Sequence, residues 1–521
     1  MKGMKVRNGA LAGLSGLMLT ASFPSLNLEW IAWISFIPLF IALQGQSPLN
    51  AFKLGLITGL CHYGTLLYWI VVALSRYGGI PLIPSLAVLV LLVVYLALYP
   101  ACFALFLARV SPLRFSSYLG AGIWVSFEYA RAHLLTGFPW CLLGYSQFLR
   151  LPLLQIADIT GVYGISFLVI LGNLVLYKLL LHWSHERKQS LAAEVVIMVI
   201  MVGLTLLYGY YHLKGTSQVA GTEGKLRVAI AQGNIDQSIK WDEDYQHKTM
   251  SIYDTLSQGS TPFQPHLIVW PETAVPFFFH DNIDLSQFVY RVARITGADI
   301  LFGSPAYETK GHIISYYNRV YLLHGDGHYA YYDKVHLLPF GEYVPLKRFL
   351  PFVHRLVPAA GDFTPGARLK TLRSSNLLVG PLICYEAIFP GLSRELSIKG
   401  AELLVNVTND AWFGRTSAPY QHLSMAVLRC IETRLPMARA ANTGLSAFIR
   451  SDGKILKQSG LFTMELLTHE LRLGKHHTTF YSLYGDIFAI LVLVGTIIWL
   501  TWALTLKKEL MPWNTRRRAK E

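Results

Sequence analysis

The chain has 521 residues, of which 53% are hydrophobic and only 15% are charged. This composition excludes an ordinary soluble enzyme, and the length allows more than one domain. The formal net charge is +14, but much of the basic charge flanks apolar segments, where it suits membrane topology and anionic lipid headgroups better than nucleic acid. The sequence contains no RNA- or DNA-binding motif. We therefore expect a membrane bundle joined to one water-soluble domain.

Neither a metal site nor a disulfide framework is predicted. The five cysteines include no CxxC spacing. His182 and His185 in "HWSH" have helical spacing, but they lie in a Lys- and Arg-rich loop, so a solvated loop is favoured over a metal site. We expect no metal and no cofactor.

Eight apolar segments approach the length of a membrane-spanning helix, which needs about 20 residues. The first and the fifth are short. The first could also be a signal peptide, because a basic start and a short apolar run precede the small residues "TAS". An uncleaved helix is favoured, because "ASFPSLNLEW" continues as a tight turn into the next segment. The eight segments are residues 9–23, 28–43, 51–74, 83–108, 118–130, 161–181, 192–211 and 487–506.

The distribution of basic residues predicts the orientation of these spans. If the N-terminus is cytoplasmic, the cytoplasmic loops carry most of the Lys and Arg, and the opposite loops carry only Arg76, Arg131 and Arg150. The positive-inside rule accepts this assignment. Residues 1–215 then form a bundle with seven spans, and residues 225–473 lie outside the cytoplasm. The last span, 487–506, returns the basic tail 507–521 to the cytoplasm.

The region 225–473 has ordinary globular composition and alternates between strand-like and helix-like segments. Apolar runs such as "LRVAIAQGN", "HLIVWPE" and "NLLVGPLICYE" end in turn residues or a charge, as buried strands do. Amphipathic or mixed stretches lie between several of them, and the turn in "RSDGKIL" predicts a hairpin over 445–456. An α/β or α+β sandwich, with helices covering a sheet, is expected.

Three ionisable residues, Glu272, Lys334 and Cys384, follow strand-like segments. Ligand sites in such sheets lie outside the carboxyl ends of the strands. Each residue alone has an ordinary explanation, since a Glu there is usually solvated and a Cys is usually a small core residue. Together they predict acyl transfer through a thioester: Glu272 takes the thiol proton, and Lys334 stabilises the thiolate and the oxyanion.

Sequence motifs around these residues resemble those of a known superfamily. "WPET" (270–273), "YDKVHLLPFGEYVP" (332–345) and "ICYEAIFP" (383–390) resemble the Glu-Lys-Cys motifs of the nitrilase superfamily. The bundle before this domain and the helix after it, with "TGFPW" (136–140), "QGNIDQSIKWD" (232–242) and "NVTNDAWFG" (406–414), are similar to the bacterial apolipoprotein N-acyltransferase family. The resemblance covers nearly the whole chain.

This resemblance implies an αββα sandwich on a bundle of eight helices in the bacterial inner membrane, with the catalytic domain on the periplasmic side. It implies a reaction in which a phospholipid acyl chain passes to the enzyme cysteine. The chain then passes to the α-amine of the N-terminal diacylglyceryl-cysteine of an apolipoprotein. Glu272 would be the general base, Lys334 the stabiliser of the oxyanion and thiolate, and Cys384 the nucleophile.

The resemblance also implies support from Glu342, Tyr385 and Glu386 and a substrate contact for Trp241. Each has an alternative explanation. Glu342 could merely pair with Lys334, Tyr385 and Glu386 could be ordinary residues at a strand end, and Trp241 could be a packed aromatic.

Two loops and one pair of charges have no assigned role. Loops 275–281 and 345–358 combine apolar with polar or basic residues, and we expect membrane-facing lids rather than core packing. Glu128 and Arg131 lie three residues apart near the end of the fifth span, and a structural ion pair is favoured over a functional site.

Two other functions remain open. A membrane-tethered hydrolase of nitrilase type would use the same three residues with water as the acceptor. A transporter or receptor with an inert nitrilase-like domain would place charges along a path through the spans, and few such charges are present.

Overall fold

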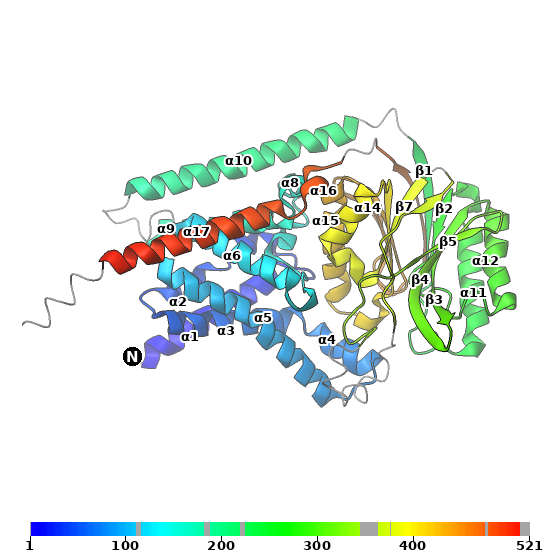
Figure 1. Cartoon of the computed structure of the whole chain (residues 1–521), viewed down its shortest axis with the longest axis horizontal. Helices are drawn as coiled ribbons and strands as arrows, with labels where there is room; N and C mark the ends of the chain where they lie inside the picture. Colours follow the sequence, from blue (N-terminus) through cyan, green and yellow to red (C-terminus); the bar gives the residue numbers. More distant parts are fainter. Residues whose placement is uncertain are drawn as a thin grey trace, which may run out of the picture.

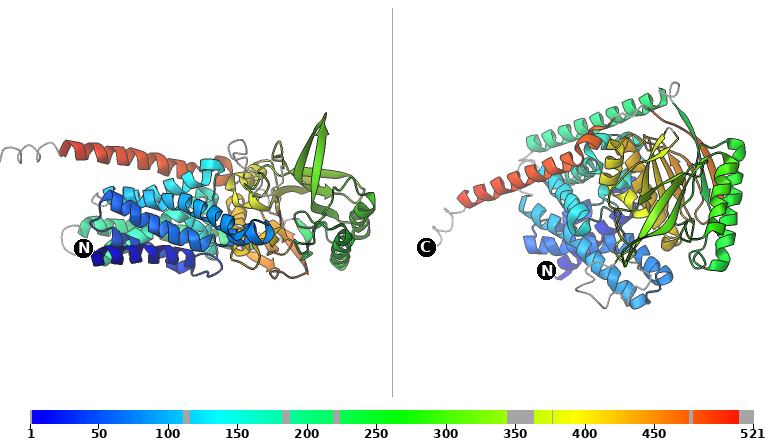
Figure 2. Two further views of the ribbon diagram at one scale, coloured as in Figure 1. Left: turned by 90° about the horizontal axis from the view of Figure 1, so that it is seen from below. Right: turned by 45° about the vertical axis from the view of Figure 1, so that its right-hand side comes forward.

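The computed structural model describes residues 2–110, 116–181, 188–218, 224–343, 363–375, 377–474 and 478–510. A helical bundle occupies one end of the molecule, and an α/β domain occupies the other (Figure 1). The first and last parts of the chain both belong to the bundle, so the α/β domain is inserted before the final helix, α17 (Figure 2).

The bundle is built from helices of very different length. The long ones are α1 (Lys2–Ala21), α3 (Pro48–Leu66), α5 (Leu82–Val110), α6 (Ser116–His133), α9 (Val162–Leu181), α10 (Lys188–Gln218) and α17 (Ile487–Leu510). Shorter pieces lie between them: η1 (Glu29–Trp33), α2 (Ile37–Leu43), α4 (Trp69–Val72), η2 (Ala73–Tyr77), η3 (Leu134–Thr136), η4 (Leu143–Gln147), α7 (Leu151–Leu154), α8 (Ala157–Thr160) and α16 (Phe480–Tyr484).

Three helices of the described chain are long and apolar enough to cross a membrane: Leu82–Val110, Val162–Leu180 and Leu191–Gly215. A fourth crossing is available if Pro48–Leu66 and Trp69–Tyr77, which meet at a bend of 44°, form one broken span. The predicted second span is divided between η1 and α2. The structure thus supports a membrane bundle with at least three spans, and the number eight stays a prediction.

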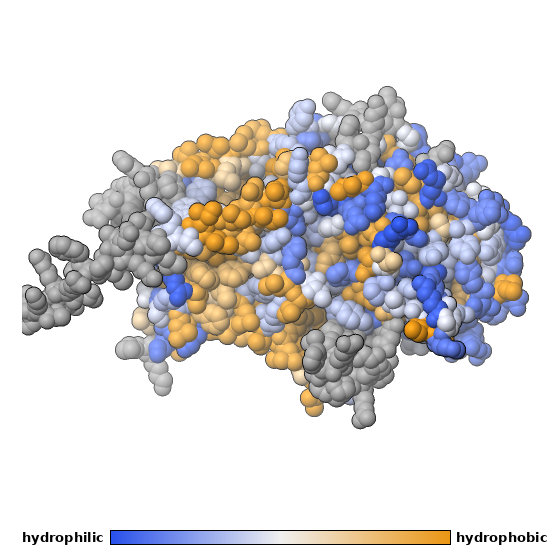
Figure 3. Space-filling view, viewed as in Figure 1, coloured by the Kyte–Doolittle hydropathy of each residue, from blue (hydrophilic) through white to orange (hydrophobic). Residues whose placement is uncertain are grey.

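The surface of the bundle differs from that of the α/β domain. Large apolar side chains are exposed on α5 and α10, among them Leu91, Leu204 and Leu207. The visible face of the bundle is mostly hydrophobic, whereas that of the α/β domain is mostly hydrophilic (Figure 3). Such a large apolar area is unfavourable in water, so lipid is the solvent that fits this face.

Helices α3 and α5 pack closely because two glycines of α3 face small residues of α5. A Cβ atom added at Gly55 would lie 2.4 Å from the carbonyl oxygen of Pro100, and one added at Gly59 would lie 2.6 Å from the Cα atom of Ala97. Small residues at such contacts are typical of helix pairs in membranes, where dispersion contacts rather than the hydrophobic effect hold helices together.

The α/β domain consists of two six-stranded sheets that pack face to face. The first sheet has the order β12-β1-β2-β3-β4-β5, with bounds Glu465–Arg472, Lys225–Gln232, Leu267–Val269, Asp299–Lys310, Ile313–Leu323 and Tyr329–Asp333. The second has the order β11-β10-β9-β8-β7-β6, with bounds Ile455–Gln458, Ala447–Ile449, Met437–Ala441, Leu403–Thr408, Leu377–Ile383 and Leu372–Ser374. The predicted hairpin over 445–456 is confirmed as β10 and β11.

Helices cover both outer faces of this pair of sheets. Helices α11 (Glu243–Gln258) and α12 (Ile283–Thr296) cover the first sheet, while α14 (Pro390–Ile398) and α15 (Ala418–Thr433) lie between the second sheet and the bundle (Figures 1 and 2). The helix–sheet–sheet–helix sandwich is confirmed. Strands β1, β2 and β3 run parallel, as do β7, β8 and β9, so several strand ends meet at one edge.

Helix α15 joins the domain to the bundle through Gln421. The indole N–H groups of Trp69 and Trp140 donate to Gln421 Oε1 at 3.2 and 2.8 Å. Its amide nitrogen faces the carbonyl oxygens of Pro24 and Leu66, both at 3.3 Å. All these groups are buried, so each needs the partner it has.

We expect Gln421→Leu to destabilise the protein without a large change in volume. The substitution leaves two buried indole N–H groups without an acceptor, and each such group costs about 1–3 kcal/mol. Thermal unfolding of the purified protein in detergent measures the effect. Gln458→Leu, at an exposed position of β11, is the control and should leave the midpoint nearly unchanged. An unchanged midpoint for Gln421→Leu would contradict this account of the joint.

Candidate active site

The structure brings Glu272, Lys334 and Cys384 together at one edge of the two sheets. Glu272 follows β2, Lys334 directly follows β5, and Cys384 directly follows β7. The Lys334 ammonium lies 4.0 Å from Glu272 Oε1, and both charges act on the Cys384 thiol. Glu272 and Lys334 are buried, while Cys384 is half-buried. The three residues thus lie close together, and their catalytic roles stay predictions.

Glu272 is held by donors on both sides of its carboxylate. The amide of Asn318 donates to Oε1, and the backbone N–H of Asn409 donates to Oε2, both at 2.8 Å. Beneath it lies Gly303, where an added Cβ atom would come within 2.8 Å of Glu272 Cα. The carboxylate is fixed in position, and its backbone has no room to move towards β3.

Lys334 is paired with Glu342. Its ammonium lies 2.8 Å from Glu342 Oε2, and the amide of Asn318 also donates to Glu342 Oε1 at 2.7 Å. Burial alone would lower the pKa of Lys334, but Glu342 and Glu272 outweigh it and raise this pKa above its ordinary value. Lys334 is therefore a permanent cation. Glu342 pairs with Lys334, and its further part in the reaction stays a prediction.

Cys384 begins the short helix η6 (Cys384–Ile388) with φ of 50°, in the left-handed region. Burial and the negative charge of Glu272 raise the pKa of its thiol, and Lys334 opposes this change. The resting group is consequently a thiol, and a nucleophilic sulfur requires transfer of its proton to a base. Glu272 is the carboxylate whose charge the thiol feels most strongly.

Glu386 ties the Lys334 segment to the Cys384 segment. Its Oε1 accepts from Tyr332 Oη at 2.8 Å and from two backbone N–H groups at 335 and 336, while Oε2 accepts from the N–H of Ile383 at 2.8 Å. Its carboxylate is fully buried. Glu386 therefore sets the distance between the Lys334 segment and Cys384.

Tyr385 and Trp241 occupy different surroundings. Tyr385 is buried and packs against Phe389, with 5.1 Å between the ring centroids. Trp241 is 53% exposed and lines a hollow of about 1100 Å³ together with Phe278 and Tyr316. It is not a packed core aromatic. Its neighbour Lys240 is buried and donates to the carbonyl oxygen of Glu272 at 3.3 Å, which holds this hollow next to the site.

The expectation of an exposed lid at 275–281 is wrong for most of its apolar residues. Val275, Phe277 and Phe279 are buried, and Phe279 stacks against several aromatic rings of the first sheet and α12. Only Phe278 among the three phenylalanines is less buried, and it contacts Tyr307. Core packing is the correct explanation. Loop 345–358 and "HWSH" lie outside the described residues.

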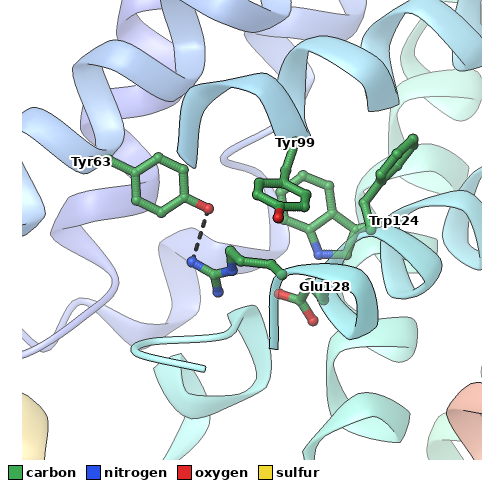
Figure 4. A pocket seen from close by; sticks show the side chains of 6 residues that line it. Tyr63, Tyr99, Trp124 and Glu128 are labelled. Carbon is green, nitrogen blue, oxygen red and sulfur yellow. Dashed lines mark hydrogen bonds between the residues drawn. The ribbon is translucent and has the colours of Figure 1, made fainter. Parts of the chain in front are cut away.

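Glu128 and Arg131 do not form the expected direct ion pair in the described structure. Glu128 Oε1 accepts from the N–H of Leu143 at 2.6 Å, and Arg131 donates to Tyr63 Oη at 3.0 Å and to the carbonyl oxygen of Cys141 at 3.4 Å. The Tyr63 bond is drawn in Figure 4. Both side chains instead form hydrogen bonds with backbone groups of the irregular segment that follows α6.

Two residues of the site were not singled out in the sequence: Asn318 and Asn409. Asn318 joins the two carboxylates, and it is a buried polar residue within the aromatic run of β4. Asn318 is nevertheless a buried amide, and a buried amide needs partners. Asn409 contributes its backbone N–H, which no side-chain pattern reveals.

The family comparisons cover both parts of the molecule. The model described as apolipoprotein N-acyltransferase N-terminal domain matches residues 15–175, and the one described as carbon-nitrogen hydrolase matches residues 227–479. A Geobacter metallireducens protein named apolipoprotein N-acyltransferase is 44% identical over 94% of both chains. The chain belongs to the apolipoprotein N-acyltransferase family.

Other members of the apolipoprotein N-acyltransferase family also match over nearly the whole chain. The protein of that name from Methylococcus capsulatus is 34% identical over 95% of both chains, and that from Haemophilus influenzae is 30% identical over 91% of both. A solved amidase from Nesterenkonia sp. is 20% identical, covering 47% of this chain and 90% of its own, with a TM-score of 0.37 that is too low to bear on function. Family membership and the apolar helices make this a membrane protein.

We expect Lys334→Met to destabilise the fold by about 3–5 kcal/mol, because it leaves the buried Glu342 carboxylate without its cation. The double variant Lys334→Met, Glu342→Gln removes both charges and should recover most of that loss. Thermal or urea unfolding in detergent measures both. A double variant no more stable than the single one would show that the pair does not carry this stability.

Proposed function

We propose that this protein transfers an acyl chain from a phospholipid to Cys384, and from there to the α-amino group of the N-terminal S-diacylglyceryl-cysteine of an apolipoprotein. The observation that carries the proposal is the family name of relatives that match over the whole chain, together with Cys384 beside Glu272 and Lys334. Both substrates are lipids, which accounts for a catalytic domain joined to a membrane bundle.

In the first half of the reaction, Glu272 takes the proton of the Cys384 thiol as the sulfur attacks the ester carbonyl of the phospholipid. Lys334 stabilises the oxyanion of the tetrahedral intermediate. The intermediate then collapses, the ester C–O bond breaks, and Glu272 returns the proton to the departing alkoxide of the lysophospholipid. The product is a thioester on Cys384.

In the second half, the α-amine of the acceptor attacks the thioester carbonyl, and Glu272 takes a proton from the attacking nitrogen. The C–S bond breaks, an amide forms, and the proton returns to the Cys384 sulfur. Since one cysteine serves both substrates in turn, the kinetics are ping-pong. Every proton in this scheme is carried by Glu272 and every negative charge faces Lys334, so no cofactor is required.

The supporting residues act on this scheme without exchanging protons. Glu342 keeps Lys334 charged and in place, and Glu386 holds the Lys334 and Cys384 segments together. Tyr385 packs behind the nucleophile, and Trp241 contacts substrate from its exposed position in the hollow. Glu342, Tyr385 and Glu386 are positioning residues, while Trp241 is a binding residue.

We further propose the arrangement of the chain in the bacterial inner membrane. Residues 1–215 form seven spans and residues 487–506 form the eighth, with the catalytic domain, 225–473, on the periplasmic side and the tail, 507–521, in the cytoplasm. The three long apolar helices and the apolar face of the bundle support a multi-pass arrangement. The orientation rests on the distribution of Lys and Arg among the loops.

Hydrolysis is the alternative, since water could replace the amine in the second half. The family relationship over the whole chain, bundle included, favours transfer. Purified protein that released fatty acid from phospholipid and never acylated a lipopeptide with a free N-terminal amine would overturn the proposal in favour of hydrolysis.

Incubation with phospholipid alone is expected to add one acyl group, of palmitoyl or similar mass, to Cys384. Intact-protein and peptide mass spectrometry detect it, and addition of a diacylglyceryl lipopeptide should discharge it as the N-acylated product. Cys384→Ala should form no adduct, whereas the matched control Cys430→Ala, a buried free cysteine on α15, should form it normally. An adduct on another residue would contradict the assignment of the nucleophile.

Gly303→Ala is expected to slow formation of this adduct by about 10–100-fold, because even a displacement of about 1 Å at a catalytic group can cost that much. The added methyl would press on the backbone of Glu272 and Thr273. Gly391→Ala, where a Cβ atom meets nothing within 4 Å, is the control and should acylate at the wild-type rate. Equal rates for both variants would show that the position of Glu272 is not critical.

A further inference from the structure

The backbone of Cys384 requires an explanation of its own. Its φ of 50° lies in the left-handed region, which is unfavourable for a residue with a Cβ atom. Such a conformation persists only where the surroundings hold it. The N–H of Ile383, one residue earlier, is held by Glu386. The carbonyl of Cys384 must therefore be held from another side.

Two side chains face the carbonyl oxygen of Cys384. His422 Nε2, from α15, lies 3.1 Å away, and Asn406 Nδ2, from β8, lies 3.5 Å away. A carbonyl oxygen only accepts hydrogen bonds, so the close contact requires a hydrogen on Nε2 of His422. The His422 side chain is almost completely buried, so this bond does not compete with water.

The side chain of Arg439 contacts both of these donor side chains. It is fully buried on β9, donates to Asn406 Oδ1, and lies 2.9 Å from Asp410 Oδ2 and 3.0 Å from His422 Nδ1. Nδ1 of His422 faces two groups: an N–H of Arg439 at 3.0 Å, which only donates, and Asp410 Oδ1 at 3.2 Å, which only accepts. Whichever of these contacts decides the state of Nδ1, the hydrogen on Nε2 is directed at the carbonyl oxygen of Cys384.

Charges of opposite sign act on His422. Burial, followed by the Arg439 charge, lowers the pKa of His422, although Asp410 opposes the change. Burial would raise the pKa of Asp410, but Arg439 and His422 bring it to about 2. Arg439 and Asp410 thus form a compensated pair beneath the imidazole, and the bond that His422 donates through Nε2 requires no change in its protonation state.

Helix α15 itself is fixed next to this contact. Gln421, the residue before His422, accepts from Trp69 and Trp140 of the bundle. The His422 ring also packs against Trp140, with 5.8 Å between the ring centroids. The imidazole is therefore held in three directions: by the bundle, by Arg439 and by the nucleophile's own carbonyl.

We propose that His422 is a positioning residue for the nucleophile, holding the Cys384 peptide through the bond from Nε2 so that the sulfur faces the acyl carbonyl. The inference rests on the proposed role of Cys384. It assigns to Arg439 and Asp410, which both contact Nδ1, the task of orienting the imidazole.

The test compares His422→Phe, which keeps an aromatic ring without a donor, with His422→Gln, which keeps an amide donor near the position of Nε2. The readout is the rate of Cys384 acylation by phospholipid, followed by mass spectrometry across a range of pH. His422→Phe should acylate about 10–100-fold more slowly, because misorientation of a reacting group has costs of this size. His422→Gln should recover to within about threefold of wild type, again because orientation is restored. The pH profile should keep its midpoint in both variants, since His422 exchanges no proton.

Ser424→Ala is the matched control, because Ser424 is equally buried on α15 but bonds to the backbone of Gln421 within its own helix. It should acylate at the wild-type rate. Thermal unfolding identifies variants that fail to fold, and His422→Met is a second variant without a donor. If neither donor-free variant folds, His422→Gln decides: a folded Gln variant that acylates more than tenfold slower than wild type overturns the proposal.

The remaining outcomes distinguish a failure of the role of His422 from a failure of the proposed function. Acylation of folded His422→Phe at the wild-type rate overturns the role of His422, as does a shifted pH midpoint in His422→Gln, which would indicate proton exchange. Absence of any acyl adduct on wild-type Cys384 would instead overturn the proposed function.

Discussion

The ammonium group of Lys334 lies in the interior between two carboxylates, and the arrangement of the site depends on the need to compensate this charge. An ion of this kind loses several kcal/mol of hydration when it is buried, unless partners replace the water. Glu342 is the close partner, and Glu272 faces the ammonium from the other side. The carboxylates then need donors, which Asn318 and backbone N–H groups supply. One buried cation therefore brings together the ends of strands that are far apart in the chain.

Cys384 is placed by a second set of buried polar groups that reaches into the membrane bundle. Glu386 holds the peptide before Cys384, and His422 holds the carbonyl after it. The residue next to His422 is Gln421, whose partners are indoles of the bundle. Catalytic geometry and the joint between the two domains thus share one helix, α15. This arrangement is suited to an enzyme whose substrates reside in the membrane, because the site cannot be oriented independently of the bundle.

Those parts of the fold and of the candidate site that depend on local sequence patterns could be predicted. Strand-like runs followed by Glu272, Lys334 and Cys384 placed these residues at strand ends, and parallel strands bring such ends to one edge. The hairpin at β10 and β11 followed from its turn residues. The prediction failed where residue type alone was used to judge whether a side chain is exposed. Phe277 and Phe279 looked like a membrane-facing loop, yet both lie in the core, because an apolar run beside a sheet packs as readily inwards as outwards. Glu128 and Arg131 had the spacing of a helical pair, yet unpaired backbone groups of a neighbouring segment attract both.

By itself, the sequence determined the separation into an apolar bundle and an α/β domain, the strand-end positions of three reactive residues and the family to which the chain belongs. These properties depend on composition, periodicity and motifs, which are local. Only the tertiary structure decided that Asn318 bridges two carboxylates, that Glu386 spans the distance between the segments of Lys334 and Cys384, and that His422 and Arg439 lie beneath Cys384. The reason is that a buried polar group must find its partner wherever the fold brings one, and the sequence alone does not reveal which distant residues will meet.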